Sequence, residues 1–238
     1  MIVKDEVKIL EKCVESVKSI VNEFVIVDTG STDGTQDVIK KYGELHEIPF
    51  TNYVDTKNAA LKLAKSDYVL FMDADETIVA GLDVLKEYAQ TGTECVHGKI
   101  IERTSTTTLS SYFRARLWKN SGNWKFEGPG VHEYIVSTAG GTSTIDHRII
   151  VKHDHSHRDA SSTDKFFGYI EILNSFLEKH PDDGRAVFYL ARTYKDLSNY
   201  MQAIVNYRKY IELDSHYRDE CWQARYDEAI CWKKMGEY

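Results

Sequence analysis

The sequence predicts an α/β domain over residues 1–160 and an α-helical region over residues 161–238. Two observations lead to this division. In the first part, short apolar runs alternate with amphipathic helical patterns, a rhythm typical of strands joined by helices. Beyond Pro181 every pattern is helical, and one stretch of sequence is repeated. A chain of 238 residues has room for a domain of each kind.

The first part of the chain predicts a mostly parallel sheet with helices on both faces. Valine and leucine recur at three- and four-residue spacing over residues 7–21, which indicates an amphipathic helix. Strands are expected at residues 1–3, 23–27, 45–48 and 68–72. Two further helices are expected at residues 33–42 and 55–64. In such sheets ligands bind beyond the carboxyl ends of the strands, the positions that Asp5, Asp28 and Asp73 occupy.

The later part of the chain has a different texture. Three strands are expected within residues 96–153, separated by the glycine-rich stretches SGNWKFEGPG and STAGGTS, which are interpreted as loops. A helix at 164–179 follows. ARTYKDLSNY (191–200) then returns as AICWKKMGEY (229–238), 38 positions later (229 minus 191). The apolar spacing within this repeat is tetratricopeptide-like, although that repeat is usually about 34 residues long.

Composition excludes several classes of protein. The net charge of −7 argues against a nucleic-acid partner, and no apolar run approaches the ~18 residues of a membrane span. The four cysteines form no CxxC pair, which favours reduced thiols and a cytoplasmic location. Both ends interrupt a regular pattern, so we expect the chain to be a fragment of a longer protein.

The stretch DYVLFMDADET carries the strongest chemical signal. Five apolar or aromatic residues lead into Asp73, Asp75 and Glu76, acids that need a positive partner if they are buried. On extended backbone Asp73 and Asp75 point to the same side, so both can reach one cation, and carboxylate oxygens favour Mg²⁺ or Mn²⁺. The alternative is a solvated acidic loop at the end of a strand.

Asp28, in IVDTGSTDGT, follows the apolar strand expected at residues 23–27. Its carboxylate can accept a hydrogen bond from a ribose or a base, and the alternative is an aspartate that forms a turn or caps a helix. The sequence has neither GxGxxG nor GxxxxGK[ST], which argues against a dinucleotide cofactor and a P-loop.

Taken in order, MIVKDE, VIVDTGSTDGT and KNAALKLAKSDYVLFMDADE resemble the nucleotide-sugar half of family 2 glycosyltransferases of the GT-A (Rossmann-like) fold. The later RLWKN, WKFEGPGVHE and VKHDHSH segments resemble a subgroup that carries C-terminal tetratricopeptide-like helices. The resemblance implies metal-dependent, inverting transfer of a hexose or N-acetylhexosamine from a UDP-sugar to an acceptor hydroxyl. The metal would be Mn²⁺ or Mg²⁺, and the acceptor a protein, a lipid or a glycan.

The resemblance also implies roles for individual residues. The residues that match nucleotide-sugar contacts are Ile2, Val3, Lys4, Glu6, Asp28, Lys57, Asn58, Asp73, Ala74 and Asp75. Asp75 is expected to be the more direct metal ligand, with Asp73 beside it and His153 close to the metal or the diphosphate. Lys57 stands where the family usually has arginine, and lysine lacks the bidentate fork of a guanidinium.

An acceptor hydroxyl needs a base, and Glu133 in PGVHEYI is the first candidate, with Glu127 in KFEGPG the second. Arg116, Trp124 and His132 are candidate contacts on the acceptor side. Each has a structural alternative: Arg116 as a salt-bridge partner of Glu133, Trp124 as a core aromatic residue, and His132 as a packed histidine.

Three further interpretations stay open. HDHSH places His153, His155 and His157 at strand spacing, which would allow a zinc site, although one histidine near the diphosphate is favoured. FMDADET also fits the signature of haloacid-dehalogenase-like phosphatases, with Asp73 as the nucleophile. A non-catalytic scaffold that binds a peptide on the helical repeats is the third.

Overall fold

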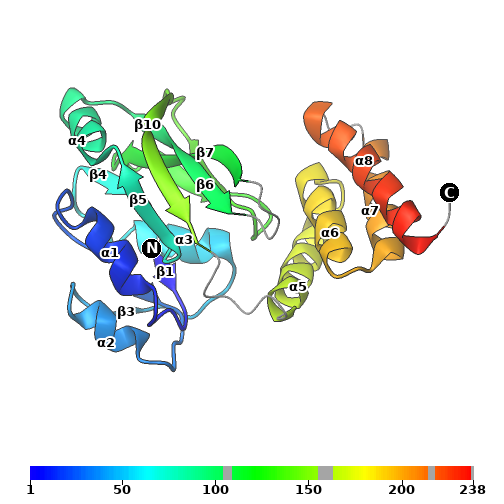
Figure 1. Cartoon of the computed structure of the whole chain (residues 1–238), viewed down its shortest axis with the longest axis horizontal. Helices are drawn as coiled ribbons and strands as arrows, with labels where there is room; N and C mark the ends of the chain where they lie inside the picture. The colour runs from blue at the N-terminus through cyan, green and yellow to red at the C-terminus, as the bar shows by residue number, and fades with distance from the viewer. Residues whose placement is uncertain (104–108, 155–162, 214–217, 237–238) are drawn as a thin grey trace. The chain divides into compact units, whose positions relative to one another are not determined.

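The computed structural model describes residues 1–103, 109–154, 163–213 and 218–236 (Figure 1). The chain forms two compact units, and each contains separate segments of the sequence. The sheet unit comprises Met1–Thr51, Asp55–Phe126 and Tyr134–Asp159. The helical unit comprises Asn52–Val54, Glu127–Glu133 and Ala160–Tyr238. The predicted domain boundary between residues 160 and 161 stays a prediction.

The first strands pair in parallel, as the sequence predicted. The order is β1 (Ile2–Val3), α1 (Leu10–Val17), β2 (Val27–Asp28), α2 (Thr35–Lys40), β3 (His46–Glu47) and α3 (Tyr53–Leu61). The three strands form one sheet in the order β1-β2-β3, with β2 parallel to both neighbours. Because the strands run in the same direction, the loops that follow β1 and β2 lie at the same edge of this sheet.

A second, mixed sheet forms the larger part of the sheet unit. Its elements are β4 (Tyr68–Leu70), β5 (Glu76–Ala80), β6 (Cys95–Arg103), β7 (Leu109–Lys119) and β10 (Thr144–His153), with α4 (Leu82–Thr91) between β5 and β6. The strand order is β4-β7-β6-β10-β5, and only β6 and β10 are parallel. The expectation of a single, mostly parallel sheet was therefore wrong, because β4 pairs with the later strand β7 instead of continuing the first sheet.

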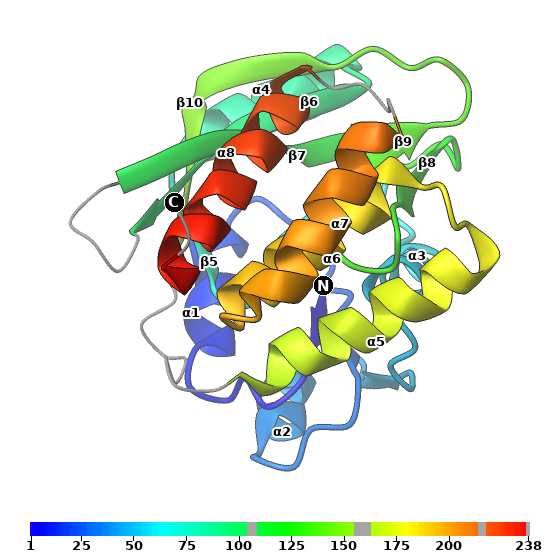
Figure 2. The same ribbon diagram turned by 90° about the vertical axis from the view of Figure 1, so that its right-hand side faces the viewer.

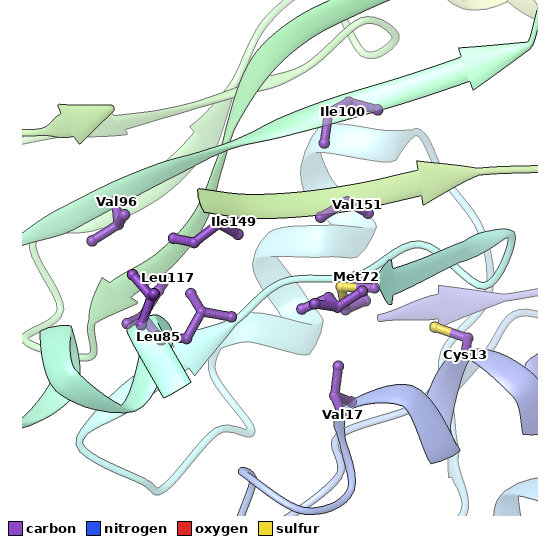
Figure 3. Close-up of a cluster of buried hydrophobic side chains, with 11 residues drawn as sticks. Cys13, Val17, Met72, Leu85, Val96, Ile100, Leu117, Ile149 and Val151 are labelled. Atoms are coloured by element: carbon purple, nitrogen blue, oxygen red, sulfur yellow. The ribbon is translucent and has the colours of Figure 1, made fainter. Parts of the chain in front are cut away.

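One face of the mixed sheet is buried against α1 and α4. Figure 3 shows this apolar cluster, in which side chains from β6, β7 and β10 meet those of the two helices and of Met72. Its buried members are Cys13, Val17, Met72, Ile78, Val84, Leu85, Val96, Ile100, Leu117, Ile149 and Val151. Met72 immediately precedes Asp73, so this core anchors the segment that carries the acids.

A short pair of strands, β8 (Trp124–Glu127) and β9 (Tyr134–Ser137), forms where the sequence predicted a loop. Trp124 is buried, with 7% of its surface exposed. A Cβ atom on Gly141 would lie 2.8 Å from the indole ring, so Trp124 packs closely against this glycine. The loop interpretation failed because SGNWKF holds a buried alternation, with Trp124 and Phe126 inward and Lys125 exposed.

The helical unit contains α5 (Asp164–Lys179), α6 (Gly184–Asp196), α7 (Tyr200–Glu212) and α8 (Arg218–Met235). Figure 2 shows α6 and α7 side by side, and consecutive helices pack against one another. Asp183 and Asn199 cap α6 and α7, accepting hydrogen bonds from backbone N–H groups of the first turn. These helices confirm the predicted α-helical region, although Tyr238 of the sequence repeat lies outside the described residues.

No helix within the described ranges is both long and apolar enough to cross a membrane.

Candidate active site

The acids of DADE form a tight turn at the end of β4, called here the acidic turn (residues 73–76). The Glu76 N–H donates to the Asp73 carbonyl oxygen at 3.1 Å, and the Glu76 carboxylate accepts the Asp73 N–H at 2.8 Å. The predicted extended backbone was therefore wrong at this point. The chain has to reverse here, because β5 leaves the turn to pair with β10.

Asp73 is held by two cations from other elements. Lys57 Nζ of α3 lies 3.1 Å from Asp73 Oδ1, and Arg114 Nη1 of β7 lies 3.0 Å from Asp73 Oδ2. Burial alone would raise the pKa of Asp73, but Lys57, Arg114 and Arg116 hold it well below its ordinary value. Asp73 is therefore a fixed carboxylate with both oxygens engaged.

Asp75 meets the histidine that the resemblance placed near the metal. His153 Nε2 lies 3.0 Å from Asp75 Oδ2, and the Asp154 N–H donates to the Asp75 carbonyl oxygen at 2.9 Å. The pairing of β10 with β5 sets His153 opposite Glu76, which brings the imidazole to the turn. Burial lowers the pKa of His153, but its hydrogen bond to Asp75 and the charge of that carboxylate outweigh burial and raise it.

Glu76 is paired deep in the protein. Both of its oxygens accept from Arg116 at 2.6 Å, and neither side chain has any exposed surface. Arg116 also donates to the Phe71 carbonyl oxygen at 3.1 Å. Arg116, expected at the acceptor side or as a partner of Glu133, is instead a buried support of the acidic turn.

The structure therefore pairs Asp73 and Glu76 with lysine and arginine side chains, and Asp75 with a histidine. Sequence reasoning assigned no role to Arg114 and paired no acid of the turn with Arg116. A signal was present, because SYFRARLW places the two arginines at i and i+2 of a strand, on the same face. What the sequence did not contain was the information that β7 would pair with β4.

Beyond β1 and β2, two loops are joined by side-chain hydrogen bonds. Asp5 Oδ1 accepts the Thr32 N–H at 2.7 Å, and the Glu6 N–H donates to Thr35 Oγ1 at 2.7 Å. Asp28, which is 1% exposed, accepts from the Ser31 N–H at 3.1 Å and from the Gln36 side chain at 2.9 Å. Burial raises the pKa of Asp28, but these hydrogen bonds outweigh it and lower the pKa. Asp28 thus makes the contacts of an aspartate that forms a turn, which was the alternative to a nucleotide contact.

The other residues expected to contact the nucleotide lie around these loops. Ile2 and Val3 form β1, whereas Lys4 after them is exposed. Asn58 follows Lys57 on α3, and its side-chain amide exchanges two hydrogen bonds, of 2.9 and 2.8 Å, with the backbone of Phe126. The Asn58 side chain therefore holds β8 in place.

The candidate bases belong to the helical unit, whereas the acidic turn belongs to the sheet unit. Glu127 ends β8, and His132 and Glu133 follow within the segment Glu127–Glu133. His132 is exposed and Glu133 is half-buried. Their roles on the acceptor side stay predictions. His155 and His157 of the alternative zinc site lie outside the described residues.

The donor atoms at the acidic turn suit a divalent metal bound jointly with a phosphate. His153 Nε2 and Asp75 Oδ2 lie 3.0 Å apart, a hydrogen-bond distance, and imidazole nitrogen and carboxylate oxygen are both common ligands of divalent metals. Within the described ranges no group of three or more histidine, cysteine or acidic side chains has metal-binding geometry. Mg²⁺ sites commonly have only one or two protein carboxylates, with phosphates and water as the other ligands.

A cavity of about 560 Å³, partly open to solvent, lies in the sheet unit. Its walls are mainly apolar, with side chains from β4 and α4, and Lys57 and Phe71 contribute to them. Asp28, Asp73 and Asp75 do not line it. The polar loops beyond β1 and β2 and the acidic turn are therefore better suited to a charged nucleotide than this cavity.

Comparison with known proteins identifies relatives of this chain. Residues 1–150 match the sequence model described as Glycosyl transferase family 2. A TPR repeat-containing protein of Synechococcus elongatus is 30% identical over 140 residues, covering 57% of this chain and 34% of the relative. The SPbeta prophage-derived glycosyltransferase SunS of Bacillus subtilis is 25% identical over 234 residues, covering 92% of this chain and 54% of SunS. The chain thus spans between a third and about half of these two relatives.

Among solved structures, S. aureus TarS has the same fold. Residues 1–349 of TarS in complex with UDP-GlcNAc align with a TM-score of 0.52 at 15% identity, covering all of this chain and 91% of that one. A longer TarS chain also gives 0.52, with 97% and 53% covered. These matches confirm the predicted α/β fold with C-terminal helices. Since the family model covers well over half of the chain, the protein is a member of glycosyl transferase family 2.

Proposed function

We propose that the protein transfers a hexose or N-acetylhexosamine from a UDP-sugar to an acceptor hydroxyl, with inversion and with the aid of Mn²⁺ or Mg²⁺. The observation that carries this proposal is the approach of Asp75 and His153 to 3.0 Å at the end of β10. Family membership supports glycosyl transfer, and the UDP-GlcNAc and UDP complexes of TarS support a uridine nucleotide as the donor.

Each residue of the acidic turn has a separate task in the proposed reaction. Asp75 and His153 would hold the metal, which supplies positive charge to the diphosphate as the bond to the sugar breaks. Asp73, fixed by Lys57 and Arg114, keeps a negative charge beside that site. Arg116 and Glu76 prevent the turn from moving, so that its carboxylates need no reorganisation during the reaction.

The loops beyond β1 and β2 are the proposed nucleotide contacts. Their hydrogen bonds orient the backbone around Asp5 and Asp28 without a ligand. Such preorganisation lowers the entropy cost of binding. Lys4 is exposed beside these loops and would meet the nucleotide from solvent. Ile2, Val3 and Glu6 complete the proposed contact region.

A titration of UDP by isothermal calorimetry, with Mn²⁺ and after its removal with EDTA, tests the proposal. We expect UDP to bind in the presence of Mn²⁺ and to bind much more weakly after chelation. UDP-glucose and UDP-N-acetylglucosamine would then be compared as donors, with hydrolysis by water as the assay. Absence of UDP binding, or release of phosphate from a simple phosphoester that depends on Asp73, would overturn the assignment in favour of the phosphatase alternative.

Glu133→Gln tests the proposed base. We expect UDP affinity to stay unchanged and donor hydrolysis or transfer to slow by at least ~100-fold, because glutamine cannot take the proton of the attacking hydroxyl. The assay compares the kcat and KM of this variant with those of Glu127→Gln. If Glu133→Gln keeps full activity and Glu127→Gln loses it, the base is Glu127.

The acceptor is proposed only as a class: a hydroxyl group of a protein, a lipid or a glycan. A peptide partner on α6 to α8 and a cytoplasmic location remain predictions. All four cysteines are free in the structure.

A further inference from the structure

The segment Glu127–Glu133, called here the EGPGVHE loop, is anchored on the helical unit. Val131 is 1% exposed and packs in an apolar cluster with Leu173 of α5 and with Ala186 and Leu190 of α6. The approach is close, because a Cβ atom on Gly130 would lie 2.5 Å from Cγ2 of Ile172. Gly130 has a φ of +88°, so its backbone conformation and its contact with α5 both favour glycine.

The next residue of the loop is held in an unusual conformation. His132 has a φ of +55°, in the left-handed region, which carries an energetic cost for a residue other than glycine. Two contacts with α6 oppose that cost. The His132 ring stacks on the Tyr189 ring, with centroids 3.9 Å apart and planes at 14°, and Arg185 Nη2 donates to the His132 carbonyl oxygen at 3.0 Å. Arg185 also lies over Tyr189, with 4.9 Å from Cζ to the ring centroid.

These contacts lie directly before the proposed base. Glu133 is the residue after His132, so the backbone direction at Glu133 depends on the conformation that Tyr189 and Arg185 impose on His132. Val131 fixes the loop on the other side of His132. The loop that carries the proposed base is thus fastened to α5 and α6, which lie beyond residues 1–150, the part of the chain that matches the family model.

We propose that Tyr189, on α6, is a positioning residue for Glu133. The proposal rests on the proposed function, in which Glu133 accepts the proton. Tyr189 acts through His132: the stacked rings hold the αL backbone at His132, and that backbone directs the Glu133 side chain. A small misplacement of a catalytic group can reduce the rate by up to about 100-fold.

The test compares Tyr189→Ala with Tyr189→Phe in hydrolysis of the UDP-sugar that the wild-type protein hydrolyses faster. We expect Tyr189→Ala to lower kcat by about 10- to 100-fold with an unchanged KM and unchanged UDP affinity. Tyr189→Phe keeps the stacked ring and should retain wild-type kcat. Tyr200→Ala is the matched control and should leave kcat unchanged, because this half-buried tyrosine shares the apolar cluster of α6 to α8 with Tyr189 but does not pack in the cluster around Val131.

Arg185→Met provides a second variant in case Tyr189→Ala does not fold, since it frees the His132 carbonyl without removing core volume. Wild-type kcat in either Tyr189→Ala or Arg185→Met, or an equal loss in Tyr200→Ala, would overturn the positioning role. Failure of the proposed function is a different result, because the wild-type protein would then neither bind UDP with Mn²⁺ nor hydrolyse a UDP-sugar.

Discussion

Arg116→Met is expected to lower the free energy of unfolding by about 3–5 kcal/mol, because it leaves the Glu76 carboxylate buried without its cation. Both side chains have no exposed surface, and two hydrogen bonds of 2.6 Å join them. Methionine fills much of the space but cannot donate to Glu76 or to the Phe71 carbonyl oxygen. The Asp73 N–H still donates to Glu76 in this variant, but a buried carboxylate without a cation has to take up a proton or admit water, and both are costly.

Chemical unfolding in urea, followed by circular dichroism, measures this loss as a fall in the midpoint concentration. Lys40→Met is the matched control, because Lys40 pairs with Asp37 at 3.4 Å on the surface, where a pair is worth at most about 1 kcal/mol. The double variant Arg116→Met with Glu76→Leu should recover only part of the loss, since the Asp73 N–H then also loses its acceptor. A loss below about 1 kcal/mol in Arg116→Met would contradict the importance of this pair.

The sequence predicted those parts of the fold that depend on local pattern. The parallel order of β1, β2 and β3 follows from the short helical crossovers between them, and the amphipathic spacing located α1. The neighbour of β4 could not be predicted in this way. Tyr68–Leu70 pairs with Leu117–Lys119, far along the chain. The apolar character of β4 is equally compatible with this pairing and with a place in the first sheet. Strand pairing over such a separation is decided by the packing of the whole sheet.

The same dependence on distant strand pairing explains why only part of the candidate site could be predicted. Acids after a strand can be recognised from the sequence, so Asp73 and Asp75 were named as candidates, and the family resemblance added His153, which the structure places beside Asp75. Their cations come from other elements, and only the pairing of β7 with β4 brings Arg114 and Arg116 to the turn. The extended conformation assigned to Asp73–Asp75 failed for a related reason. The reversal of the chain into β5 depends on β10, which is about 70 residues away in sequence.

Replacement of Asp75 by asparagine should have the largest effect on the reaction. We expect turnover to fall by about 10²- to 10³-fold, the size of effect found when one electrostatic contact to a developing charge is removed. Asparagine keeps the shape of the side chain and can still accept a hydrogen bond from His153, so the turn should keep its conformation. What is lost is one negative charge, and this loss should weaken the binding of a divalent cation more than it destabilises the turn.

Calorimetry, together with an unfolding measurement, separates the effect of the Asp75 charge on metal-dependent binding from its effect on the fold. Asp75→Asn should bind UDP with the same weak affinity whether Mn²⁺ or EDTA is present, while its circular dichroism spectrum and urea midpoint stay close to those of the wild-type protein. Asp83→Asn, which removes an exposed carboxylate in the first turn of α4, is the control and should keep both metal-dependent UDP binding and turnover. If Asp75→Asn also keeps them, the cation at this edge of the sheet is not held by Asp75. The metal would then have to be held by the other two predicted ligands, His153, which lies beside the turn, and Asp73, whose oxygens would have to leave Lys57 and Arg114 to reach it.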